Sequence, residues 1–279
     1  MSPVLFDTIG PLIAAALYLT ATVLLWNATI TNSPGGRKAS LAIVAAAAVI
    51  HSVVQYHVWM HQSMSQVDLA TVLSLCALVV VILWTSTLPR PSGAIETGLM
   101  ALPIAAIANF LDAAFQGSVF GGESGLVGSP PGTVVHVVTS VVAFGMLSLA
   151  SGYAVLVLAI DHSLKRHHLS RLVRHLPPLE NLEHLLFGLV ATGFILLTVA
   201  LGSGLIYVDN LMAQHLVHKT VLGFLAWIVF GTLLLGRWLK GWRGGLAVRL
   251  TLAGAALLLL SYFGSKLVLE VILGRSWYS

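Results

Sequence analysis

Residues 183–208 read EHLLFGLVATGFILLTVALGSGLIYV, and no Asp, Glu, Lys or Arg follows Glu183 in this stretch. A helix needs about 20 mostly apolar residues to cross the hydrocarbon core of a membrane. Backbone polar groups cannot stay unpaired in hydrocarbon, so a run of this length forms a helix and not an open strand. The stretch therefore predicts a membrane-spanning helix.

Seven other runs have the same character. With them we expect eight spans, at 9–31, 39–61, 67–88, 95–115, 133–160, 183–208, 216–237 and 246–273. Of the 279 residues only 9% are charged, whereas a soluble domain carries about 25%. The sequence therefore predicts an all-α, polytopic membrane helix bundle of about eight transmembrane helices, with residues 1–279 as a single transmembrane domain surrounded by membrane lipid.

The basic residues follow an alternating pattern along the loops. The loops at 62–67, 116–132 and 209–215 contain no Lys or Arg, whereas the loops between them contain most of these residues. The positive-inside rule places the basic loops in the cytoplasm, so we expect both termini on the outer side. The basic residues therefore set topology, and we expect no nucleic-acid partner.

Six histidines lie in the predicted second, fifth and seventh spans: His51, His57, His61, His136, His215 and His218. Residues three or four apart share a helix face, so His57 and His61 form one pair and His215 and His218 another. Because successive spans alternate in direction, five of the six lie at a similar level in the outer half, with His51 deeper. Ionisable residues inside a membrane are costly, so this cluster indicates a functional site.

Imidazole is a ligand of haem iron and also of zinc and copper. A haem held by two histidines needs one imidazole on each face of the ring, and the small and branched residues around His136 suit a flat macrocycle. A zinc site requires about four ligands close together. We therefore expect haem b, while a divalent-metal transport or accessory subunit using His57, His61, His215 and His218 stays an alternative.

A third hypothesis is a transmembrane electron carrier with two haems, the lower one on His51. Lys219 and Lys266 are candidate partners of haem propionates. Two other readings stay open for them: Lys219 reaching toward lipid headgroups, and Lys266 pairing with Glu270, four residues further along the chain.

Three stretches resemble a known family: HKTVLGFLAW at 218–227, GWRG at 241–244 and SYFGSK at 261–266. His136 at the start of the fifth span and LPPLENLE at 176–183 also fit. These segments resemble the cytochrome c assembly protein family, which includes the CcsA, CcmC and HemX groups. The resemblance implies a haem-handling, multi-pass protein of the bacterial inner (cytoplasmic) membrane, with His136 and His218 as candidate ligands of the haem iron.

The sequence departs from the cytochrome c synthase branch of that family in two places. The loop at 116–132 contains no tryptophan, and the last span ends without the histidine of that branch. We also find no nucleophile with a base, no phosphate-binding glycine loop and no catalytic carboxylate pair. We therefore expect a haem-binding protein that is not an enzyme, acting in haem handling or cytochrome c maturation. Its partners are haem and lipid, and another membrane protein or a second copy stays open.

Overall fold

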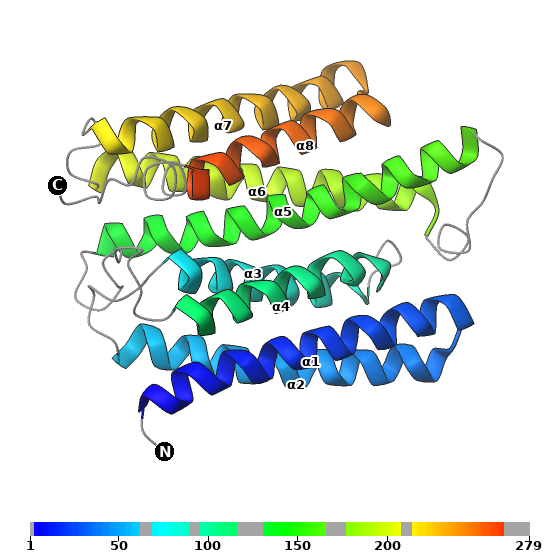
Figure 1. Ribbon diagram of the computed structural model, residues 1–279. Helices are drawn as coiled ribbons and strands as arrows, with labels where there is room; N and C mark the ends of the chain where they lie inside the picture. The colour runs from blue at the N-terminus through cyan, green and yellow to red at the C-terminus, as the bar shows by residue number, and fades with distance from the viewer. Residues whose placement is uncertain are drawn as a thin grey trace. The chain divides into compact units, whose positions relative to one another are not determined.

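The computed structural model describes most of the chain, namely residues 3–61, 69–89, 95–115, 131–165, 177–207 and 214–264. Within these residues the elements are all helical, which confirms the predicted fold class (Figure 1). The long helices are α1 (Pro3–Thr31), α2 (Pro34–His61), α3 (Leu69–Thr87), α4 (Gly98–Phe115), α5 (Pro131–Lys165), α6 (Leu179–Tyr207), α7 (Gln214–Lys240) and α8 (Gly245–Leu259).

Eight helices in the described part are long and apolar enough to cross a membrane, which confirms the predicted number of spans. A short 3₁₀ helix, η2 (Ile95–Thr97), precedes α4, and a π-helical turn, η4 (Leu260–Gly264), continues α8. The predicted last span, 246–273, extends beyond the described residues. The orientation of the two termini stays a prediction.

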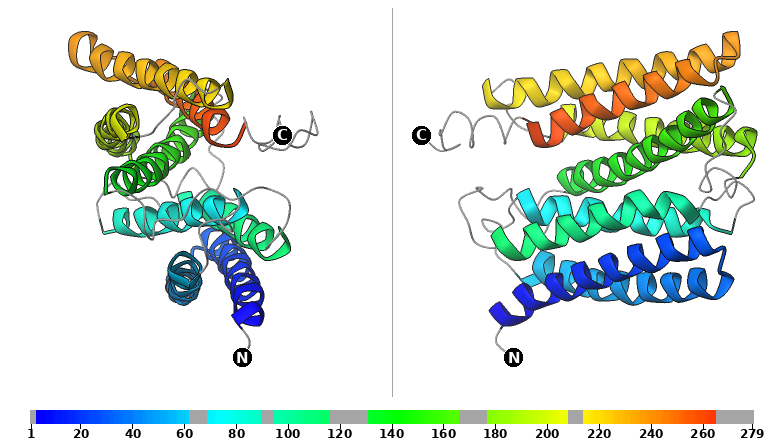
Figure 2. Two further views of the ribbon diagram at one scale, coloured as in Figure 1. Left: turned by 90° about the vertical axis from the view of Figure 1, so that its left-hand side faces the viewer. Right: turned by 45° about the vertical axis from the view of Figure 1, so that its right-hand side comes forward.

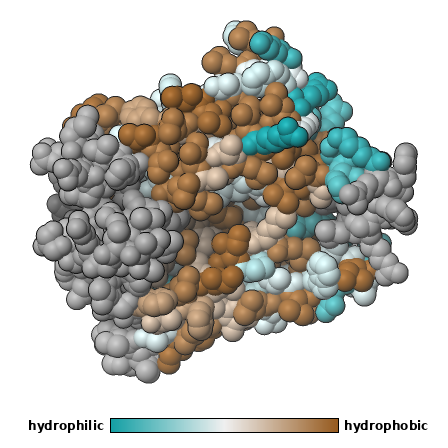
Figure 3. Space-filling view, turned by 45° about the horizontal axis from the view of Figure 1, so that its top comes forward, coloured by the Kyte–Doolittle hydropathy of each residue, from teal (hydrophilic) through white to brown (hydrophobic). Residues whose placement is uncertain are grey.

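The exposed helix faces are apolar. Val49, Ile104 and Ile195 are each more than half exposed, and hydrophobic residues cover much of the face visible in Figure 3. Such side chains would be costly in water, but they match lipid tails. The apolar surface therefore agrees with the low share of charged residues in the chain.

The chain divides into two compact units, which we describe separately. Unit 1 comprises Met1–Val127 with His162–Leu182, and unit 2 comprises Gly128–Asp161 with Glu183–Ser279. Whether they make a single domain stays a prediction.

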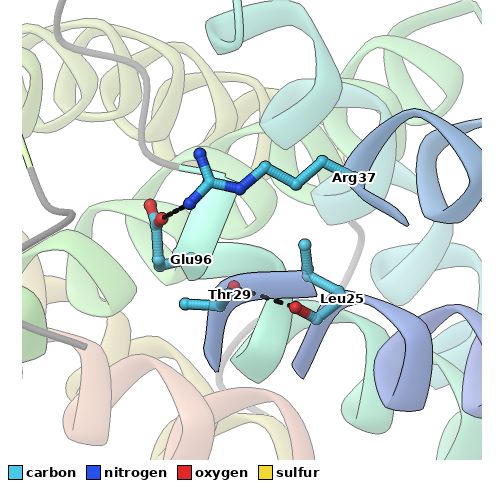
Figure 4. A network of polar contacts seen from close by, with 4 residues as sticks. All are labelled: Leu25, Thr29, Arg37 and Glu96. Atoms are coloured by element: carbon cyan, nitrogen blue, oxygen red, sulfur yellow. Dashed lines mark hydrogen bonds and ion pairs between the residues drawn. The ribbon is translucent and has the colours of Figure 1, made fainter. Parts of the chain in front are cut away.

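Unit 1 contains the first four long helices. In it, α1 packs against α2 and α4, and α3 packs against α4 (Figure 2). The side chain of Arg37, in the first turn of α2, reaches Glu96 of η2, with Nη2 3.6 Å from Oε1 (Figure 4). The Glu96 side chain is almost fully buried. The ion pair therefore ties the start of α2 to the segment that leads into α4.

Within the described residues, unit 2 contains α5 as far as Asp161, α6 from Glu183 onward, α7 and α8. It also contains the GWRG stretch noted in the sequence. That stretch forms the turn between α7 and α8, where Gly241 and Gly244 have positive φ angles of 65° and 62°. A side chain would strain both positions. The Glu183 carboxylate on α6 accepts a hydrogen bond of 2.8 Å from the backbone N–H of Gly244. The turn is thereby fixed to the neighbouring helix.

Candidate functional site

His136 lies near the start of α5 and is half-buried. Its Nδ1 is 2.7 Å from the backbone carbonyl oxygen of Ala200 on α6. A carbonyl oxygen can only accept, so Nδ1 carries the hydrogen and donates it. In the neutral ring the lone pair is then on Nε2, the atom available to ligate a metal.

α6 also provides the space that this ring occupies. Gly204 lies one helical turn after Ala200, and a Cβ atom there would be 2.9 Å from Cε1 and 3.0 Å from Nδ1 of His136. The ring could not keep its position beside a larger residue. The absence of a side chain at Gly204 and the carbonyl of Ala200 together set the position and the tautomer of His136.

This arrangement is the one that metal-binding histidines commonly have. A ligating imidazole usually donates its other N–H to a carbonyl or carboxylate, which fixes the ring and raises the basicity of the ligating nitrogen. The start of α5 also packs against the end of α6, because a Cβ on Gly132 would overlap the ring of Tyr207. His136 is therefore held firmly while its Nε2 keeps its lone pair.

His51 in unit 1 has different surroundings. Its side chain is fully buried, and its Nε2 is 2.9 Å from the Ser74 hydroxyl oxygen. On the other side, Nδ1 is 3.2 Å from Nδ2 of Asn109 and 3.4 Å from the Tyr18 hydroxyl oxygen. An amide nitrogen only donates, so Nδ1 accepts and Nε2–H donates to Ser74. Both ring nitrogens are engaged.

A second group of polar side chains lies one helical turn from His51. The Thr71 hydroxyl donates to Oδ1 of Asp112 at 2.8 Å, and Nε2 of Gln55 is 3.5 Å from Oδ2. Oε1 of Gln55 accepts from the Trp59 indole N–H at 3.0 Å. Gln55 is four residues after His51, so α2 contributes to both groups.

This polar network was not predicted from the sequence, where His51 is interpreted only as a candidate ligand. A signal was present, because three helices each carry two polar residues three or four positions apart: His51 and Gln55, Thr71 and Ser74, and Asn109 and Asp112. Such pairs on separate spans share helix faces that can meet. The assignment of His51 as a cofactor ligand stays a prediction, and it would require one of these hydrogen bonds to break.

The other candidate residues are only partly described. His57 is half-buried on α2 in unit 1. The side chains of His61, His215, His218 and Lys219 lie outside what the structure describes, and so does all of Lys266. The pairing of two histidines on one iron therefore stays a prediction.

The metal-site alternative also stays a prediction. Among the side chains that the structure describes, no group of three or more His, Cys, Asp or Glu residues is placed to hold a metal ion. Three of the four histidines in that hypothesis are outside this set.

Comparisons with known proteins identify the family of the chain. The family model described as cytochrome C assembly protein matches residues 10–273. The inner membrane protein YpjD of Escherichia coli K12 is 38% identical over 142 residues, which are 51% of this chain and 54% of that protein. An uncharacterized 28.8 kDa protein of Azospirillum brasilense is 31% identical over 151 residues, 53% of this chain and 56% of that protein.

The chain thus spans about half the length of the curated relatives it matches. No solved structure matches it. The eight apolar helices and the bacterial inner-membrane relative confirm a multi-pass protein of that membrane. The matched residues include nearly all of the described helices, and the resemblance seen in the sequence is confirmed: the chain belongs to the cytochrome c assembly protein family.

Proposed function

We propose that this protein binds haem b in the bacterial inner membrane and acts in haem handling for cytochrome c maturation, without catalytic activity of its own. Family membership supports the role in cytochrome c maturation. The observation that carries the haem assignment is His136, whose Nδ1–H is bound to the Ala200 carbonyl and whose Nε2 lone pair is left for iron.

The second axial ligand in this proposal is His218. It lies in the first two turns of α7, and His136 lies in the first two turns of α5. Only a short stretch separates the end of α6 at Tyr207 from the start of α7 at Gln214. Both helix starts are therefore near the end of α6 that holds His136. Two imidazoles from separate helices can hold a haem iron between them, one on each face of the ring.

Bound haem supplies an iron that can change oxidation state. The chain's own residues would hold it: His136 and His218 through the iron, and Lys219 and Lys266 as candidate contacts of the propionates. Ala200 would keep the His136 ring in one tautomer.

The test is the absorption spectrum of the full-length protein purified from haem-replete cells. We expect a reduced b-type band that is lost in His136→Ala and in His218→Ala. His184→Ala is the matched control, because His184 is an exposed histidine near the other end of α6, and it should keep the band. A pyridine haemochrome assay identifies haem b and its stoichiometry. A colourless preparation, or stoichiometric zinc or copper without haem, would contradict the proposal.

A further inference from the structure

One turn of α6 contains the hydrogen-bond acceptor of His136, a glycine beside its ring and a serine that bonds to the same acceptor. The carbonyl oxygen of Ala200 accepts from Nδ1–H of His136 at 2.7 Å, and it also accepts from the Ser203 hydroxyl at 3.0 Å. Gly204 leaves the space beside the ring. Ser203 is buried, so its hydroxyl is held near the ring and away from bulk water.

The Ala200 carbonyl is shared by more donors than usual. Inside an α-helix the same oxygen also accepts the backbone N–H four residues later, here that of Gly204. An oxygen with two lone pairs that serves three donors binds each of them less strongly than it would bind fewer. The Ser203 hydroxyl therefore weakens the bond that Nδ1–H of His136 makes.

The strength of that bond affects the iron ligand. A stronger bond from Nδ1–H gives the imidazole more anionic character and makes Nε2 a better donor. A better donor favours ferric over ferrous iron, and so lowers the reduction potential of a haem.

We propose that Ser203 and Gly204 are positioning residues that regulate the haem site through His136. Ser203 limits how strongly Nε2 of His136 donates to the iron, and Gly204 fixes the orientation of the imidazole ring. The inference rests on the proposed haem function, because it concerns the same histidine. Neither residue would be a ligand of the iron.

The first test replaces the hydroxyl. Ser203→Ala should strengthen the bond from His136 to Ala200 and shift the ferric-to-ferrous equilibrium toward ferric by about three- to tenfold. That change corresponds to a midpoint potential about 30–60 mV lower. Ser151→Ala is the control, because Ser151 makes the same kind of bond to Leu147 on α5, at 2.9 Å. The midpoint potential of the haem in Ser151→Ala should equal that of the wild type.

The second test fills the space. Gly204→Ala should displace the ring and weaken haem binding by about tenfold or more, and added imidazole should restore the low-spin spectrum. Gly202→Ala is the control, because no atom lies within 4 Å of a Cβ placed there. Both substitutions raise helix propensity equally. A difference between them therefore reports the ring contact.

A measurement on haem-free protein separates this inference from the proposed function. In ¹⁵N-histidine-labelled protein, the Nδ1–H proton of His136 should move downfield in Ser203→Ala and stay unchanged in Ser151→Ala. If the protein never holds haem but this shift is present, the haem function fails, while the effect of Ser203 on the bond from His136 to Ala200 is retained. Equal proton shifts and equal potentials in Ser203→Ala and wild type would overturn the inference, even if Gly204→Ala failed to fold.

Discussion

His51 and His136 are both histidines inside predicted spans, and the sequence makes both of them candidate haem ligands. Their surroundings differ. Around His51, helices α1, α3 and α4 each supply a polar side chain, and both ring nitrogens are engaged. Around His136, α6 supplies a backbone carbonyl and a glycine, and among the described residues Nδ1 is the ring nitrogen that has a partner. The comparison teaches that the partners of the second nitrogen distinguish a core histidine from a candidate ligand.

The largest expected effect concerns the ligand side of this comparison. His136→Gly should remove the haem band completely, and imidazole added to the buffer should restore it, because the half-buried position leaves a path for a small ring. His51→Gln, which keeps a polar side chain in the network, should retain the haem content of the wild type. Reduced-minus-oxidised spectra measure both. Loss of haem in His51→Gln with retention in His136→Gly would make His51 the ligand and His136 the core histidine.

The next effect concerns stability. His51→Leu leaves Ser74, Asn109 and Tyr18 without the imidazole, and each buried polar group that loses its partner costs about 1–3 kcal/mol. We expect the unfolding free energy in bicelles to fall by about 2–4 kcal/mol. The haem content of the protein that stays folded should not change. A loss below about 0.6 kcal/mol, the average for hydrogen bonds between membrane helices, would mean that the network adds little.

A smaller effect is expected at the second polar group. Thr71→Val removes the hydroxyl that donates to Asp112 at 2.8 Å, and we expect a loss of about 1.5–2 kcal/mol, as for other hydrogen bonds to acidic groups. Thr20→Val is its control, because the exposed Thr20 hydroxyl donates to the Ala16 carbonyl of its own helix. Equal unfolding free energies for the two variants would show that the bond to Asp112 is not stabilising.

The smallest effect separates two serines close to His51. Ser74→Ala leaves Nε2–H of His51 without its acceptor and should cost about 1 kcal/mol. Ser52 directly follows His51 in sequence, but its hydroxyl bonds to Ala48 of its own helix. Ser52→Ala should therefore change the unfolding free energy by less than about 0.5 kcal/mol. If the two variants lost the same unfolding free energy, the bond from His51 to Ser74 would stabilise the protein no more than the bond from Ser52 to Ala48.

Much of the fold could be predicted from the sequence, because span length and apolar content are local properties of the chain. The eight spans, and the family stretches at 218–227 and 241–244, could each be recognised from a short segment of sequence. The bond from Gly244 to Glu183 could not be predicted, because those residues are far apart in sequence.

The site was predictable only in part, for the same reason. The sequence identified His136 but not its neighbours Ala200 and Gly204, or Ser203, which bonds to Ala200. All three look like ordinary small residues of a membrane helix. Which faces of two helices meet depends on the relative rotation of the helices. That rotation cannot be deduced from the sequence pattern of either helix alone. The polar network around His51 was missed for that reason too.

The length of α5 has a consequence for how the protein sits in bilayers of different thickness. Its 35 residues extend about 50 Å at a rise of about 1.5 Å per residue, whereas the hydrocarbon core measures about 30 Å. The last turn carries the exposed, water-seeking side chains of His162 and Lys165. In a thicker bilayer more of this end of α5 would lie in hydrocarbon, and in a thinner bilayer less of it would. This adjustment takes place far from the turn that carries His136.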